Sequence, residues 1–115
     1  MKLSKYAQYC VFLLAIVLVL AVFAVAAGKG DPAAGKAVYD KRCATCHAAA
    51  GEGKPAIAKS LKVELRHLGS KEVQAKSDKD LLKDTVEGIG KMKPEKGLTE
   101  QQQADVLAYM RTLKQ

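Results

Sequence analysis

Hydrophobic residues follow two different patterns along the chain. From Val11 to Ala27 they form one uninterrupted run, whereas after Lys29 they recur singly among charged residues. In this second part their spacing of three or four residues is typical of amphipathic helices. No segment of this part makes a credible strand. We therefore expect an all-α fold of three to four helices.

Caps and turn residues predict where the first helices lie. Asp31 is a helix-capping residue and Pro32 fits the first helical position, so a helix should run from there to about the cysteines at 43 and 46. Residues 48–55, AAAGEGKP, predict a loop. A short amphipathic helix should follow, with leucines at helical spacing before a glycine stop: Leu61, Leu65, Leu68 and Gly69.

Two more helices are predicted near the end of the chain. Ser77 and Asp80 resemble a capping box, and Thr99 with Gln102 forms a second one. Between these helices GKMKPEKG is too rich in Gly, Pro and Lys for regular structure, which places Met92 on a loop. The helix after Ser77 has the apolar residues Leu81, Leu82, Val86 and Ile89, and it should end at Gly88 and Gly90. The helix after Thr99 has the apolar face Val106, Tyr109, Met110 and Leu113.

The opening segment has the layout of an export signal. Lys2 and Lys5 precede the apolar run, and small residues near its end offer a signal-peptidase site after Ala26 or Ala27. Residues 1–27 are therefore a signal peptide or an uncleaved membrane anchor. The apolar run is longer than the apolar region of most signal peptides and shorter than most membrane-spanning helices. Residues 28–115 form the folded domain, in the periplasm or at the outer face of the cytoplasmic membrane. Cys10 lies at the start of the run, so we assign it no chemistry.

The chain is basic, with a formal charge of +7 that becomes about +5 without the two N-terminal lysines. Basic proteins bind nucleic acid, membrane surfaces or acidic proteins. Here the lysines alternate with acidic residues, aromatic residues make up 5% of the chain, and an exported protein meets little nucleic acid. The charge therefore indicates a solvated surface or an acidic protein partner.

Cys43, Cys46 and His47 form C-x-x-C-H, the attachment motif of c-type haem. Two cysteines one helical turn apart can each bond one vinyl group of a haem, and the adjacent histidine then ligates the iron. A zinc site needs four ligands, and only the distant His67 remains as a further nitrogen donor. A thiol-disulfide oxidoreductase needs a βαβ unit, and a plain disulfide leaves the histidine unexplained.

The chain from about residue 31 to 113 resembles the class I cytochromes c, particularly the small bacterial ones. Gly35 and Tyr39 lie eight and four residues before the first haem cysteine, where that family has a glycine and an aromatic residue. Val106 and Tyr109 match its apolar and aromatic pair on the last helix. The resemblance implies that the first and last helices of the domain cross at these four residues.

The resemblance also implies the iron ligands. Met92 is the implied distal ligand opposite His47, although Lys93 separates it from the proline that often follows directly in the family. Pro55 is the candidate whose carbonyl accepts the N–H of the proximal histidine. His67 is the competing distal ligand, whereas Met110 lies on an apolar helix face and is expected in the core.

These residues predict a monomeric one-electron carrier, and not an enzyme, with one haem c bonded through Cys43 and Cys46. Two axial ligands leave the iron no open site for a substrate. Its partners would be redox proteins. Four loop lysines could attract an acidic partner toward the haem, or they could simply be solvated residues: Lys54, Lys91, Lys93 and Lys96. A cytochrome subunit docked permanently on a dehydrogenase or terminal reductase is an alternative, and so is a ligand-binding haem sensor.

Overall fold

The computed structural model describes residues 4–24 and 29–115, with side chains described for 4–16 and 29–115. Helices, and no strand, form within these ranges, so the all-α prediction is confirmed. The folded part has three longer and three short helices, more than the three to four expected. In chain order the helices are α1 (Lys5–Ala24), α2 (Pro32–Arg42), α3 (Ala44–His47), α4 (Pro55–Leu61), α5 (Lys71–Gln74), α6 (Asp78–Glu87) and α7 (Glu100–Thr112).

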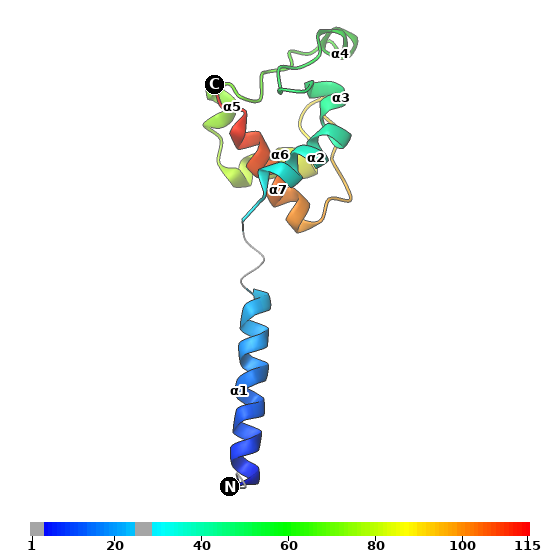
Figure 1. Ribbon diagram of the computed structural model, residues 1–115. Coiled ribbons are helices and arrows are strands. Elements are labelled where there is room, and N and C mark those ends of the chain that lie inside the picture. The colour runs from blue at the N-terminus through cyan, green and yellow to red at the C-terminus, as the bar shows by residue number, and fades with distance from the viewer. Residues whose placement is uncertain (1–3, 25–28) are drawn as a thin grey trace.

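Helix α1 extends away from the other helices (Figure 1). Its described side chains are mostly exposed, and they include Cys10 and a run of apolar residues from Val11 onward. Within the described residues no helix combines the length and the apolarity that a membrane crossing requires. The predicted cleavage positions at Ala26 and Ala27 lie outside the described residues, so the signal and anchor alternatives stay predictions.

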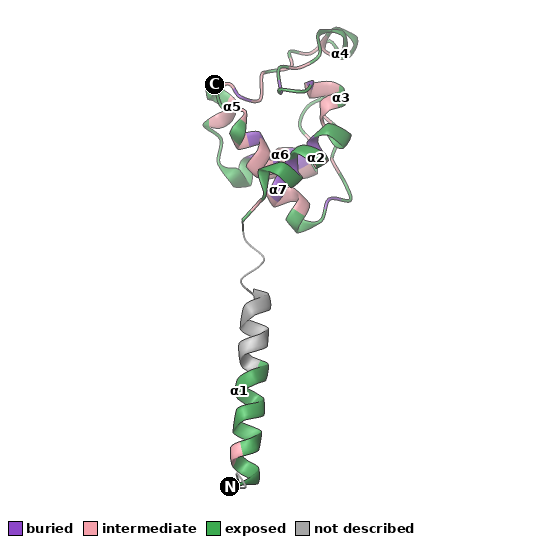
Figure 2. Ribbon diagram, in the orientation of Figure 1, coloured by how far each residue is buried: buried purple, intermediate pink, exposed green. Residues whose placement is uncertain are grey.

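The core lies where α2 crosses α7, and buried positions gather on α2, α6 and α7 (Figure 2). A Cβ atom on Gly35 would lie 1.9 Å from the carbonyl oxygen of Asp105, so only glycine permits this backbone approach. Tyr39 and Val106 are fully buried, and the rings of Tyr39 and Tyr109 pack with centroids 5.0 Å apart. The predicted contact between the first and last helices of the domain is confirmed.

The predicted caps are present. The side chain of Asp31 accepts the N–H of Ala33 at the start of α2, and Ser77 accepts the N–H of Asp80 at the start of α6. A complete capping box formed by Thr99 and its partner three residues later starts α7. These contacts join residues at most three positions apart, which is why the sequence pattern alone locates them.

The helix predicted from Leu61 to Leu68 is wrong. The helix in this region, α4, begins six residues earlier at Pro55, and Lys62 ends it in the left-handed conformation with φ 54°. The chain after Lys62 then bonds to other segments, since the N–H of Leu68 donates to the carbonyl of Gly51 at 2.8 Å. Ile89 also departs from expectation, because it follows α6 and is 51% exposed.

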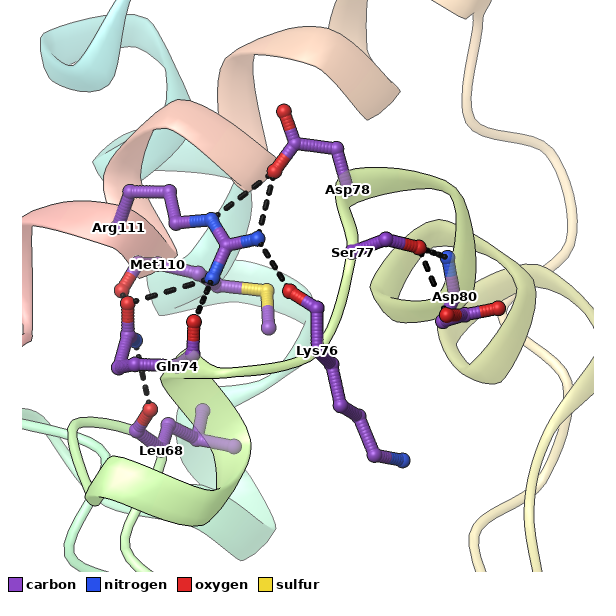
Figure 3. Close-up of polar contacts among 8 residues, drawn as sticks. All are labelled: Leu68, Gln74, Lys76, Ser77, Asp78, Asp80, Met110 and Arg111. Atoms are coloured by element: carbon purple, nitrogen blue, oxygen red, sulfur yellow. Dashed lines mark hydrogen bonds and ion pairs between the residues drawn. The ribbon is translucent and has the colours of Figure 1, made fainter.

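One arginine joins α7 to the junction between α5 and α6 (Figure 3). Nη1 of Arg111 donates to the carbonyl of Gln74 at 2.9 Å, and Nη2 donates to the carbonyl of Lys76 at 2.7 Å. Nε and Nη2 both donate to one carboxylate oxygen of Asp78, the first residue of α6. All three guanidinium nitrogens therefore hold the short segment that leads into α6.

Candidate haem site

The C-x-x-C-H motif occupies the turn that follows α2. The N–H of Cys43 still donates to the carbonyl of Tyr39 at 2.8 Å, and the N–H of His47 donates to the carbonyl of Cys43 at 3.0 Å. Both hydrogen bonds are helical, so the motif forms one compact turn that includes α3. Cys43, Cys46 and His47 are all half-buried, and both cysteines are free thiols. The structure thus brings together the three motif residues predicted from the sequence.

Burial sets the protonation of these groups. It raises the pKa of Cys43 to about 11, with a smaller contribution from the carboxylate of Glu95. The sulfur is therefore a neutral thiol near pH 7. Burial also lowers the pKa of His47, which favours the neutral imidazole. A neutral imidazole is the form that ligates a metal.

The segment after the motif is fixed by backbone hydrogen bonds. The N–H groups of Gly53 and Lys54 donate to the carbonyls of His47 and Cys46 at 2.8 and 2.9 Å. The hydroxyl of Tyr39 donates to the carbonyl of Ala48 at 2.7 Å. These bonds satisfy the free carbonyls at the end of α3 and hold the histidine backbone in one position.

Met92 lies half-buried on a tight turn after α6. Its backbone exchanges two hydrogen bonds with Ile89, of 2.9 and 3.1 Å, across a turn in which Gly90 has φ 58°. Further along, the N–H of Glu95 donates to the carbonyl of Thr85, which ties the loop back to α6. The predicted position of the methionine on a loop is confirmed.

An ion pair brings this loop to the haem motif. A carboxylate oxygen of Glu95 lies 2.6 Å from a guanidinium nitrogen of Arg42, the last residue of α2 and the neighbour of Cys43. The ion pair therefore brings the loop that carries Met92 to the end of α2 at which the haem motif begins.

His67 is engaged elsewhere. Its Nδ1 accepts the N–H of Gly69 at 2.9 Å, and its Nε2 lies 2.9 Å from the side-chain amide of Gln115. Since Nδ1 accepts, the neutral ring carries its proton on Nε2, and the amide oxygen of Gln115 is then the proper partner. Nε2 thus contacts the C-terminal residue, whereas Nδ1 fixes the local turn at Gly69.

Pro55 is the first residue of α4 and is exposed. Nδ1 of His47 is buried and has no hydrogen-bond partner among the described residues. In this structure the carbonyl of Pro55 therefore does not accept from that nitrogen, and its assigned role stays a prediction.

The unpartnered imidazole tests whether these residues fit a haem. A buried ring nitrogen without a hydrogen bond costs free energy, and native proteins retain such an atom where another group completes the site. Here the imidazole adjoins two free thiols on the same turn, which is the donor set that a covalent haem needs. The described residues contain no cluster of three His, Cys, Asp or Glu side chains suited to a metal ion. The residues fit a haem.

A model of the family Cytochrome c matches residues 32–114. The chain belongs to the cytochrome c family. Comparison with curated proteins found no match. Among solved structures, this cytochrome is similar to the KustC0563 c-type cytochrome, with a TM-score of 0.60 and 26% sequence identity. The similarity covers 70% of this chain and 98% of that one.

Membership in the cytochrome c family gives the chain a coarse function, haem-based electron transfer, with covalent haem c as the cofactor. Domains of this family typically lie outside the cytoplasm. Sequence reasoning missed two features of the site in this cytochrome, the ion pair of Arg42 with Glu95 and the bond from Tyr39 to Ala48. Both join residues whose separation follows no regular spacing, so no local pattern predicts them.

Proposed function

We propose that this cytochrome c is a one-electron carrier outside the cytoplasm, with iron ligated by His47 and Met92. The observation that carries the proposal is the half-buried turn of two free thiols and one unpartnered imidazole, with the methionine loop tied beside it through Arg42 and Glu95. A bound haem supplies an iron that accepts and releases one electron. The residues around it supply the ligands and a low-dielectric surrounding, which set the reduction potential.

The hydrogen bonds of His67 support Met92 as the distal ligand. A ring that holds Gly69 and Gln115 would have to give up both contacts to reach a metal. Met92 has no such role, because the bonds that hold its turn come from the backbone. The thioether is free to ligate, and a histidine and methionine pair leaves the iron no open position.

The loop lysines support a protein partner with an acidic surface. Lys54, Lys91, Lys93 and Lys96 are all exposed, and none is among the ion pairs found between described residues. Uncompensated positive charge beside a redox centre speeds encounter with an acidic partner. We therefore propose a freely diffusing or anchored monomer that meets redox proteins in turn.

The distal ligand can be tested by spectroscopy of the haem-loaded protein. Ferric haem with a methionine sulfur ligand has a weak far-red charge-transfer band, which the wild-type protein should show. Met92→Ala should abolish this band, lower the reduction potential and allow carbon monoxide to bind the reduced iron, because a thioether favours ferrous iron and blocks that position.

Met110→Leu is the matched control, since Met110 is buried in the core and the change nearly conserves its volume. It should keep the band. If Met92→Ala keeps the band while His67→Ala removes it or alters the ligation, the distal assignment is wrong. Carbon monoxide binding to the wild-type protein would instead indicate a ligand-binding sensor.

A further inference from the structure

Ala48, the residue directly after the proximal histidine, has a backbone conformation that alanine rarely adopts. Its φ of 62° and ψ of 177° lie in the region that is essentially reserved for glycine. A side chain in this conformation costs free energy, so the surrounding contacts must maintain it. Strain of this kind gathers at functional sites, and here it adjoins His47.

Tyr39 supplies the strongest of these contacts. Its ring is fully buried in the core between α2 and α7, and its hydroxyl donates to the carbonyl of Ala48 at 2.7 Å. The competing donor to the same carbonyl, the N–H of Gly51, is 3.5 Å away. Burial raises the pKa of Tyr39, so the hydroxyl keeps its proton and remains a donor. Its ring is in turn fixed by packing against Tyr109.

We propose that Tyr39 is a positioning residue for the proximal ligand, because its hydroxyl holds Ala48 in the glycine-like conformation and thereby fixes the orientation of the His47 imidazole. The proposal rests on the proposed function, since it concerns the histidine as an iron ligand. Phenylalanine would fill the same space in the core, but it has no hydroxyl to bond to the carbonyl of Ala48, which gives a reason for tyrosine at position 39. Residues that orient a metal-ligating histidine tune the metal that it holds.

The backbone carries this effect in two steps. The carbonyl of Ala48 belongs to the peptide that leaves Ala48, and its position relative to His47 depends on both the φ and the ψ angle of Ala48. If the hydroxyl is removed, Ala48 can relax toward an ordinary conformation. The peptide between His47 and Ala48 then rotates, and the imidazole rotates with it.

The test compares Tyr39→Phe, Ala48→Gly and the double variant in the haem-loaded protein. The readouts are the paramagnetic NMR shifts of the haem methyl groups in the ferric state, which report the orientation of the axial imidazole, and the reduction potential. Tyr39→Phe should shift both. Ala48→Gly should leave them close to wild type, because glycine adopts the observed conformation without strain. The double variant should return toward wild type, since the turn no longer needs the hydroxyl.

Tyr109→Phe is the matched control. Its hydroxyl donates to the neighbouring carbonyl of Ala49, but at 3.3 Å and in an exposed position, so its removal should leave the methyl shifts unchanged. The proposal fails if Tyr39→Phe moves the shifts no more than Tyr109→Phe does. It also fails if glycine at position 48 does not reverse the change. If Tyr39→Phe loses haem altogether, recovery of covalent haem in the double variant supports the proposal, and no recovery overturns it. A wild-type chain without covalent haem would contradict the proposed function instead.

Discussion

Tyr39 is fully buried beside the haem motif, and its hydroxyl donates a hydrogen bond to the carbonyl of Ala48. Ionisation of this phenol in the folded protein would place a negative charge in the core opposite a carbonyl oxygen. Burial is accordingly the largest cause of its raised pKa, well above the usual value near 10. The same residue thus links packing, hydrogen bonding and proton binding, which makes its contribution to stability measurable by pH.

We predict that Tyr39 makes the folded state less stable at alkaline pH. Below pH 10 both states hold the phenol proton, and the contribution is complete. Above pH 10 the unfolded chain releases this proton whereas the folded protein keeps it, so the unfolded state binds fewer protons and stability falls. One such group gives a slope of about 1.4 kcal/mol per pH unit. Denaturant unfolding of the wild-type protein between pH 8 and about 11.5 measures it.

Tyr39→Phe should remove this part of the slope while lowering stability at neutral pH. Tyr109→Phe is again the control, because it deletes a tyrosine whose hydroxyl is exposed. Equal slopes for the wild-type protein and Tyr39→Phe would show that the buried hydroxyl does not titrate as described.

At the scale of the elements, the crossing of α2 and α7 depends on one glycine. We predict that Gly35→Ala destabilises the protein, although alanine favours helix formation by up to about 1 kcal/mol over glycine. The new Cβ would lie 1.9 Å from the carbonyl oxygen of Asp105 and force the helices apart, at a cost of about 1–3 kcal/mol or more. Thermal unfolding measures the loss. Ala34→Gly, at the adjacent exposed position, should cost only about 1 kcal/mol, and a smaller loss for Gly35→Ala would contradict the close approach.

The junction of α5 and α6 depends on Arg111. We predict that Arg111→Lys costs about 1–2 kcal/mol, because an ammonium group cannot replace a planar fork that bonds Gln74, Lys76 and Asp78 at once. Hydrogen exchange should quicken in residues 71–78 before it does in α2. As a control, Lys36→Ala removes only an exposed pair within α2 and should cost less than about 0.5 kcal/mol. Similar losses for the two variants would mean that the arginine is merely a surface group.

These elements also show how much the sequence could predict. Helices α2, α6 and α7 begin where expected because their caps join neighbouring residues. The segment after α4 departs from the prediction because Leu68 bonds to Gly51, a contact between two loops. Helix α4 itself begins at Pro55, a local signal for a helix start that could have located it. Helix α5 was missed because it is a single turn, Lys71–Gln74, held by Arg111 from another helix.

The candidate haem site likewise has residues that the sequence predicts and one feature that it does not. Cys43, Cys46 and His47 could be predicted because covalent attachment to one haem edge requires them on one turn of the chain. The strained conformation of Ala48 could not, because alanine gives no local signal for a positive φ. It exists only where the completed core places a buried hydroxyl opposite its carbonyl.

For the whole molecule, the small core is the main physical constraint. Its buried cluster consists of Tyr39, Leu98 and Val106, and Cys43 packs against it. A domain of this size buries too little apolar surface for a large margin of stability. Because Cys43 packs against this cluster, a haem bonded to its sulfur would enlarge the core at that edge.

The charge of the whole molecule leads to the last prediction. If the lysines of the methionine loop dominate the field at the haem edge, the reduced protein should lose its electron to the anion hexacyanoferrate(III) more slowly as salt rises from about 10 to 100 mM. Over that range the Debye length shrinks from about 30 to 10 Å, which removes attraction beyond the nearest charges. A cationic cobalt oxidant should show the opposite trend. Stopped-flow kinetics measures both rates.

Two variants with the same change in net charge separate a local field from the overall charge. The first replaces Lys91, Lys93 and Lys96 with Gln, and the second replaces Lys79, Lys83 and Lys114, which are also exposed but lie on α6 and at the chain end. The first variant should weaken the dependence of the electron-transfer rate to the anion on salt. Its far-red band should persist, which would show that Met92 still ligates the iron. The second should leave most of the dependence in place, because its charges lie outside that loop. Equal effects would mean that net charge alone attracts the oxidant, and the loop lysines would then be ordinary solvated residues.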